Sequence, residues 1–164
     1  MKEADRKARN TERLSELYPT FRARIASVIS ALENSGIRPR IQDAWRSPED
    51  QKKDFDAGNS KLLFGFHNVT AADGTKEALA VDMLDDDSPL ALGKSYLLQL
   101  AAAAEQAGLM TGIRWGVPDG MIGAIDAAIA AKDWGANVKV GWDPSHVQPT
   151  GITPDQAKAG TRPP

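Results

Sequence analysis

The chain has 164 residues, with 20 basic and 22 acidic side chains that give a formal net charge of −2. This length suits one domain, and the hydrophobic fraction of 41% and charged fraction of 26% are typical of a globular protein rather than a disordered or fibrous one. Cysteine is absent, which excludes disulfides and thiolate chemistry and leaves only two histidines, His67 and His146, for any imidazole-dependent site.

The first third of the chain predicts helices followed by an edge strand. Between residues 14 and 32, apolar side chains recur at three- and four-residue intervals, which indicates one buried helical face, and Pro19 divides this region into two helices. Residues 37–45 read as a short strand at the edge of a sheet, because they contain a proline. A third helix begins at Ser47, a favourable N-cap followed by proline, and ends near Gly58.

The rest of the chain alternates short strands with alanine-rich helices. Residues 78–84 form an apolar run of strand length, and the acidic turn at 85–89 predicts the start of a helix that ends near Gly108. Residues 121–134 predict another alanine-rich helix, and residues 138–142 predict a last strand. We therefore expect an α+β fold with a small, mainly antiparallel sheet flanked by helices.

Charge and hydropathy argue against two classes of partner. Basic residues do not gather in one segment, so we expect no nucleic acid to bind. No apolar segment approaches the ~20 residues that span a bilayer, so we expect no membrane insertion. Residues 1–10 lack the apolar region of a secretory signal peptide, which favours location in the cytoplasm.

Three residues are candidates for a metal site. Asp82 interrupts an apolar run, where a buried carboxylate is unfavourable unless it is paired or bound to a metal. Taken singly, each has an ordinary explanation: Asp82 can face solvent or pair with a basic residue, His67 can be a satisfied core residue, and His146 can hydrogen bond to Asp143 across a tight turn. Two histidines and one carboxylate together match a catalytic zinc site with an open position, and also an Fe(II) facial triad.

Asp143 is a candidate general base for such a site. Water on a zinc ion has a pKa near ~7, and a nearby carboxylate can accept its proton as the water attacks a carbonyl. Asp143 precedes His146 by three residues, and a turn at this point predicts that both side chains lie on one side of a strand end.

Five motifs in order carry a resemblance to a known family. The motifs occupy residues 41–51, 57–60, 66–68, 78–82 and 141–146. With these motifs the sequence resembles the VanY-type zinc D-Ala-D-Ala carboxypeptidases and L-Ala-D-Glu endopeptidases, a family with a Hedgehog/DD-peptidase-like fold that includes many phage endolysins. The resemblance covers roughly residues 12–148 of one domain, 1–164, and leaves 149–164 as a tail that is either extended or frayed.

The resemblance implies a role for each candidate residue. His67, Asp82 and His146 match the three ligands of one zinc ion per chain, and Asp143 matches the catalytic carboxylate. Arg46 matches an arginine that polarises the scissile carbonyl and stabilises the oxyanion. The alternative for Arg46 is a surface salt bridge to one of two acidic residues that follow it, Glu49 or Asp50.

The sequence also departs from the family pattern. Gly65 occupies the place of a serine, and fourteen residues, an unusually long interval, separate His67 from Asp82. Residues 68–77 read as an inserted loop, which either borders the substrate groove or is an exposed turn. The helix at 121–134 lengthens a second interval, the one between Trp115 and Asp143. If loss of the serine removes a contact to a free substrate carboxylate, cleavage inside the stem is favoured over C-terminal trimming.

The leading hypothesis is a monomeric zinc peptidase that acts on the peptide stem of peptidoglycan. We expect an L-alanyl-D-glutamate endopeptidase that serves as a phage or prophage endolysin and accumulates in the host cytoplasm before release to the cell wall. The alternative within the family is a D-Ala-D-Ala carboxypeptidase or dipeptidase. More distant alternatives are an Fe(II) oxygenase, for which the sequence offers too few strands, and a non-catalytic peptidoglycan-binding module.

Overall fold

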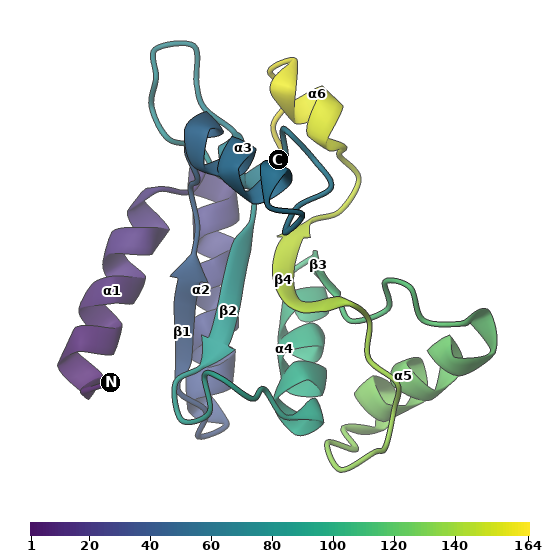
Figure 1. Ribbon diagram of the computed structural model, residues 1–164. Coiled ribbons are helices and arrows are strands. Elements are labelled where there is room, and N and C mark those ends of the chain that lie inside the picture. The colour runs from purple at the N-terminus through teal and green to yellow at the C-terminus, as the bar shows by residue number, and fades with distance from the viewer.

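The computed structural model describes all residues, 1–164, and confirms the predicted α+β class (Figure 1). Helices surround one four-stranded sheet whose paired strands are all antiparallel. The elements in chain order are α1 (Glu3–Ser15), α2 (Pro19–Asn34), β1 (Pro39–Asp43), α3 (Pro48–Asp56), the 3₁₀ turn η1 (Phe66–Asn68), β2 (Val81–Asp85), α4 (Lys94–Gln106), β3 (Leu109–Gly112), α5 (Asp119–Ala131), β4 (Asp143–Pro149) and α6 (Pro154–Lys158).

The strand order places two distant parts of the chain side by side at the centre of the sheet. The order is β1-β2-β4-β3, so β1 is an edge strand, as its proline predicts. The central strands β2 and β4 pair Val81 with Val147 and Asp82 with His146. This register sets two of the three candidate metal ligands directly opposite each other.

The core lies between one face of the sheet and helices α2 and α4, which run behind the strands in Figure 1. Val81 and Met83 are fully buried in this core. Because side chains alternate along a strand, Asp82 between them points to the opposite face. Tyr96 of α4 donates a hydrogen bond from its hydroxyl to the Met83 carbonyl oxygen at 2.8 Å, which fastens the helix to β2.

Some predicted elements are present with shifted ends: the strand expected at 78–84 is β2, which begins at Val81, and the helix expected at 121–134 is α5, which ends at Ala131. Two other predictions are wrong. The strand expected at residues 138–142 is absent, because the Gly141 and Trp142 amides donate to the carbonyl oxygens of Ile113 and Trp115 in a turn; the last strand is β4, immediately afterwards. Helix α4 begins at Lys94 rather than in the acidic turn at 85–89.

The acidic turn has a different task from the one the sequence suggests. Asp86 is buried and forms ion pairs with Arg38 and Arg40 of the β1 region and with the chain's amino terminus. Its carboxylate is therefore occupied in joining β2 to its neighbours and does not cap a helix. Strand β3 was not predicted, because it has only four residues and follows the alanine-rich helix closely.

The tail and the inserted loop hold each other in place at one end of the sheet. Arg162 binds Glu77 at 2.7 Å and the Thr70 carbonyl oxygen at 3.3 Å, so the end of the chain is anchored and not frayed. The helix predicted at 121–134 is α5, which packs on α4. No helix in the structure has both the length and the apolar character needed to cross a membrane.

Candidate metal centre

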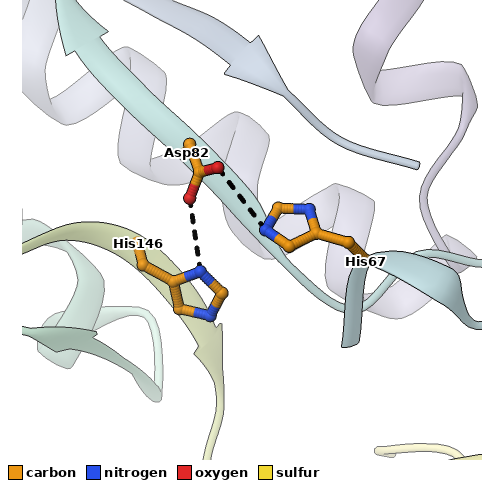
Figure 2. A group of neighbouring side chains, drawn as sticks. All are labelled: His67, Asp82 and His146. Atoms are coloured by element: carbon orange, nitrogen blue, oxygen red, sulfur yellow. Dashed lines mark hydrogen bonds and ion pairs between the residues drawn. The ribbon is translucent and has the colours of Figure 1, made fainter. Parts of the chain in front are cut away.

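Three side chains converge on the open face of the sheet (Figure 2). Asp82 lies between the two histidines: its Oδ1 is 3.2 Å from His146 Nδ1, and its Oδ2 is 3.6 Å from His67 Nε2. One donor atom from each residue lies within 4.8 Å of the others. The structure thus brings together the three residues that the sequence singled out separately.

A backbone carbonyl fixes the orientation of the His67 ring. His67 sits in the short turn η1 and is 8% exposed, and its Nδ1 lies 2.6 Å from the Ala44 carbonyl oxygen. A carbonyl oxygen only accepts hydrogen bonds, so Nδ1 carries the proton and donates it. In the neutral ring the lone pair is therefore on Nε2, the atom that faces Asp82, as a metal ligand requires; a hydrogen bond from Nε2 to Asp82 needs a second proton on the ring, which a bound ion would replace.

The side-chain amide of Gln148 fixes the orientation of the second histidine, His146. His146 Nε2 donates to Gln148 Oε1 at 3.1 Å, which leaves Nδ1 directed at Asp82. Sequence reasoning missed this glutamine. Strand alternation was the signal available, because a residue two positions after His146 in β4 lies on the same face of the sheet.

The donor spacing fits a tetrahedral ion. Protein ligands lie ~2.0–2.2 Å from zinc, which separates neighbouring donors of a tetrahedron by ~3.3–3.6 Å. The separations of 3.2 and 3.6 Å each involve a different oxygen of Asp82, and a set with one donor atom from each residue lies within 4.8 Å, so small side-chain adjustments would bring three donors around one ion. Two neutral imidazoles and one carboxylate leave one position open, the arrangement found in catalytic zinc sites.

The two carboxylates of the site have opposite pKa shifts. Burial raises the pKa of Asp82, but hydrogen bonds and charge from His146 and His67 outweigh it and hold this pKa far below its usual range. Burial also opposes protonation of His67, yet its pKa is raised by Asp82. Burial raises the pKa of Asp143, and the charge of Asp82 adds to this effect. Asp82 is therefore the weaker base and Asp143 the stronger.

A bulge in β4 brings Asp143 to the metal ligands. Thr111 of β3 pairs with Val147, whereas the next residue, Gly112, pairs with Asp143, so the three residues of β4 between them have no partner in β3. This irregularity turns two side chains three positions apart to the same side, and Asp143 Oδ2 lies 3.9 Å from His146 Nδ1. The tight Asp-Pro-Ser turn expected here is instead the first part of β4.

Arg46 reaches the site from the end of β1. Its Nη2 lies 3.9 Å from Asp82 Oδ2, and its guanidinium is held by Asp43, by Asp54 at 3.0 Å and by Gln51 Oε1 at 3.2 Å. The charge is thus fixed in position beside the candidate ligands. The surface pairs weighed as the alternative, with Glu49 or Asp50, do not form; these two acids pair with Lys53 instead.

All five candidate residues line one cavity of ≈ 680 Å³. Gly65 lines it as well, with nothing closer than 4.0 Å to a Cβ placed there. None of residues 68–77 does, so the inserted loop does not border this cavity. The lining also includes side chains that sequence reasoning did not select, namely Gln51, Asn59, Ser60, Lys61, Leu62, Phe66, Trp115, Trp142, Gln148 and Pro154.

No family model and no curated protein sequence matches this chain. Comparison with solved structures shows that the chain shares its fold with a peptidase of known structure and confirms the fold that the sequence resemblance predicts. The crystal structure of the L-Ala D-Glu endopeptidase ChiX from Serratia marcescens is similar, with a TM-score of 0.54, 22% identity and coverage of 87% of each chain.

Two further structures have lower scores. The LdcB LD-carboxypeptidase gives a TM-score of 0.47 with 16% identity, over 87% of this chain and 62% of that one. The D,D-pentapeptidase VanY from a VanB-type vancomycin resistance cassette, solved in complex with Zn(II), gives 0.42 with 15% identity, over 85% and 74% of the two chains.

Proposed function

We propose that this protein is a zinc peptidase that cleaves the peptide stem of bacterial peptidoglycan at the L-Ala–D-Glu bond. The observation that carries the proposal is the convergence of His67, Asp82 and His146 in one cavity, with Asp143 and Arg46 beside them. The similarity of fold to an L-Ala D-Glu endopeptidase over 87% of both chains supports the choice of substrate.

Each residue then has a defined task. A zinc ion held by the three ligands would supply Lewis acidity and lower the pKa of a bound water toward ~7. Asp143 Oδ2 accepts the proton of the attacking water and returns it to the departing amine nitrogen. Arg46 places its fixed positive charge where the carbonyl oxygen becomes negative, which favours the transition state over the bound substrate.

The lining of the cavity supports cleavage inside the stem over trimming of its end. Gly65 brings no hydroxyl group to the cavity at the position where the resemblance expects a serine. A free terminal carboxylate therefore lacks one hydrogen-bond donor that an exopeptidase would use.

The test is incubation of purified protein with defined disaccharide-pentapeptide muropeptides, whose stems end in D-Ala-D-Ala, followed by mass spectrometry. We expect disaccharide-L-Ala and a peptide that begins with D-Glu. Release of free D-Ala alone would instead assign a D-Ala-D-Ala carboxypeptidase or dipeptidase. Asp143→Ala should lower the rate by ~10²–10⁴-fold while about one zinc per chain is retained.

The same preparation separates the distant alternatives. Bound iron with consumption of 2-oxoglutarate would indicate an oxygenase, although a four-stranded sheet is not the eight-stranded sandwich expected of that class. Equal binding of wild type and Asp143→Ala to peptidoglycan, with no cleavage by either, would indicate a binding module.

The endolysin role and accumulation in the host cytoplasm are a further part of the proposal. A bacterial culture that expresses the protein should remain intact until its inner membrane is permeabilised, and should then lyse. Lysis before permeabilisation would contradict cytoplasmic accumulation, and intact walls after it would contradict a lytic role.

A further inference from the structure

Trp142 is an exposed aromatic side chain at the rim of the cavity. It is 69% exposed, although an indole ring ordinarily buries most of its surface. It lines the cavity and is the residue immediately before Asp143. An exposed tryptophan beside a candidate catalytic group is typical of a surface that contacts a ligand.

The surrounding backbone holds this ring in place. The Trp142 amide donates to the Trp115 carbonyl oxygen at 3.1 Å, and the two indole rings lie 5.3 Å apart at 40°. Gly116 has φ +73°, and a Cβ at this position would lie 3.1 Å from Trp142 Cδ1. A ring fixed in this way loses little conformational freedom when a ligand stacks on it.

The aromatic rings form a row of successive contacts that starts at a candidate metal ligand. The Trp115 ring centroid lies 5.5 Å from that of His146 and 5.3 Å from that of Trp142. Lys61 Nζ is 6.0 Å from the centroid of the Trp142 ring, so the outer end of the row combines an apolar face with a cation. This combination suits a ligand that has both a flat apolar face and polar substituents.

We propose that Trp142, backed by Trp115, is a platform on which the muramic acid ring of the glycan strand stacks. A pyranose ring presents a face of C–H groups to an indole, while its hydroxyl and amide groups remain available to polar neighbours. The protein would therefore act on stems that are still attached to sugar in preference to free peptides. This inference rests on the proposed function, because it assumes the L-Ala–D-Glu bond as the site of cleavage.

The length of the stem between the sugar and the scissile bond supports muramic acid as the group that stacks on Trp142. The L-Ala residue and the lactyl group separate the L-Ala–D-Glu bond from the sugar by about two units, or ~7 Å in extended form. Trp142 lies within two ring-to-ring steps of His146, 5.5 and 5.3 Å, and next to Asp143 in the chain, so a sugar two units from the scissile bond can reach it. A bond between the terminal D-Ala residues lies four or more units from the sugar, ~14 Å or more, and its sugar would not reach Trp142.

The first test compares kcat/KM for a disaccharide-linked stem and for the same stem as a free peptide. We expect the wild-type ratio to be about tenfold or more in favour of the linked stem, equivalent to ~1.4 kcal/mol, and to fall toward one in Trp142→Ala. Trp142→Phe should keep an intermediate ratio, and Leu90→Ala, at a fully exposed residue outside the cavity lining, should keep the wild-type ratio. An unchanged ratio in Trp142→Ala would overturn the inference even if cleavage itself is normal.

The second test does not depend on catalysis. Acrylamide quenching of tryptophan fluorescence is measured with and without the disaccharide lacking any peptide. We expect the disaccharide to protect the wild type, and protection to be lost in Trp142→Ala. Protection without cleavage of any stem would support the platform while refuting the proposed function, whereas cleavage without protection would refute the platform alone.

Discussion

Replacement of Gln148 by leucine is a direct test of how the site is held together. The amide oxygen of Gln148 accepts a hydrogen bond from His146 Nε2 at 3.1 Å, and it is the partner that leaves Nδ1 free to face Asp82. Leucine has a similar size and cannot accept this bond. The ring of His146 then loses its preferred tautomer and its fixed orientation, although all three ligands remain.

The expected magnitude follows from the place of this contact in the site. Loss of a partner that orients a ligating histidine typically lowers metal affinity by ~10–100-fold, equivalent to ~1.4–2.7 kcal/mol. We expect Gln148→Leu to weaken zinc binding by this factor. Gln148→Glu keeps an acceptor at the same place and strengthens it by its charge, so its affinity should match or exceed the wild type.

The assay is a competition titration for zinc against a fluorescent chelator at constant pH. Gln106→Leu, at an exposed position on α4, serves as the matched control for the loss of an amide. Wild-type zinc affinity in Gln148→Leu would refute the reasoning. Equal losses in the leucine and glutamate variants would also refute it, since the effect would then come from packing and not from the acceptor.

Three further predictions concern catalysis and stability. Arg46→Lys should lower kcat/KM on muropeptides by ~10²-fold with zinc affinity retained, because an ammonium cannot reproduce the guanidinium fork. Gly141→Ala should lower stability by about 1–3 kcal/mol in denaturant unfolding, since its Cβ would lie 2.6 Å from the Trp115 nitrogen, whereas Gly123→Ala in an open helical position should be neutral or stabilising. Burial raises the pKa of Tyr96 above its ordinary 10.0, so above pH 10 this tyrosine ionises only in the unfolded chain. The free energy of unfolding should therefore fall by ~1.4 kcal/mol per pH unit above pH 10, and Tyr96→Phe should lack this contribution.

Local signals in the sequence were sufficient to predict most of the helices and the central strand β2. Helices α2 and α3 lie where apolar periodicity, Ser47 and the flanking prolines place them. The acidic turn at 85–89 misled because the partners of Asp86 are distant in sequence, in the segment around Arg38. A carboxylate that forms a long-range ion pair is not available to cap a helix, so the local sequence pattern there predicts a helix start that does not form.

The candidate site shows the same division. The residue types alone, two histidines, no cysteine and one carboxylate in an apolar strand, restricted the chemistry to a small set of metal sites. Their convergence depends on the β2–β4 register, on the bulge before His146 and on the carbonyl of Ala44. The motif resemblance groups these residues, but no local pattern in the sequence encodes the contacts themselves, because pairing between residues 64 positions apart is decided by the packing of the whole sheet.

The sequence by itself thus determined which side chains were available for chemistry, and the tertiary structure decided which of their atoms face one another. Strand alternation predicts that Asp82 leaves the core, but only the fold shows that it meets both histidines. The platform of Trp115 and Trp142 was likewise invisible in the sequence, since its two rings belong to segments joined by turns whose hydrogen bonds are not local. Side-chain identity is a local property, whereas contact is set by the long-range pairing that buries the core.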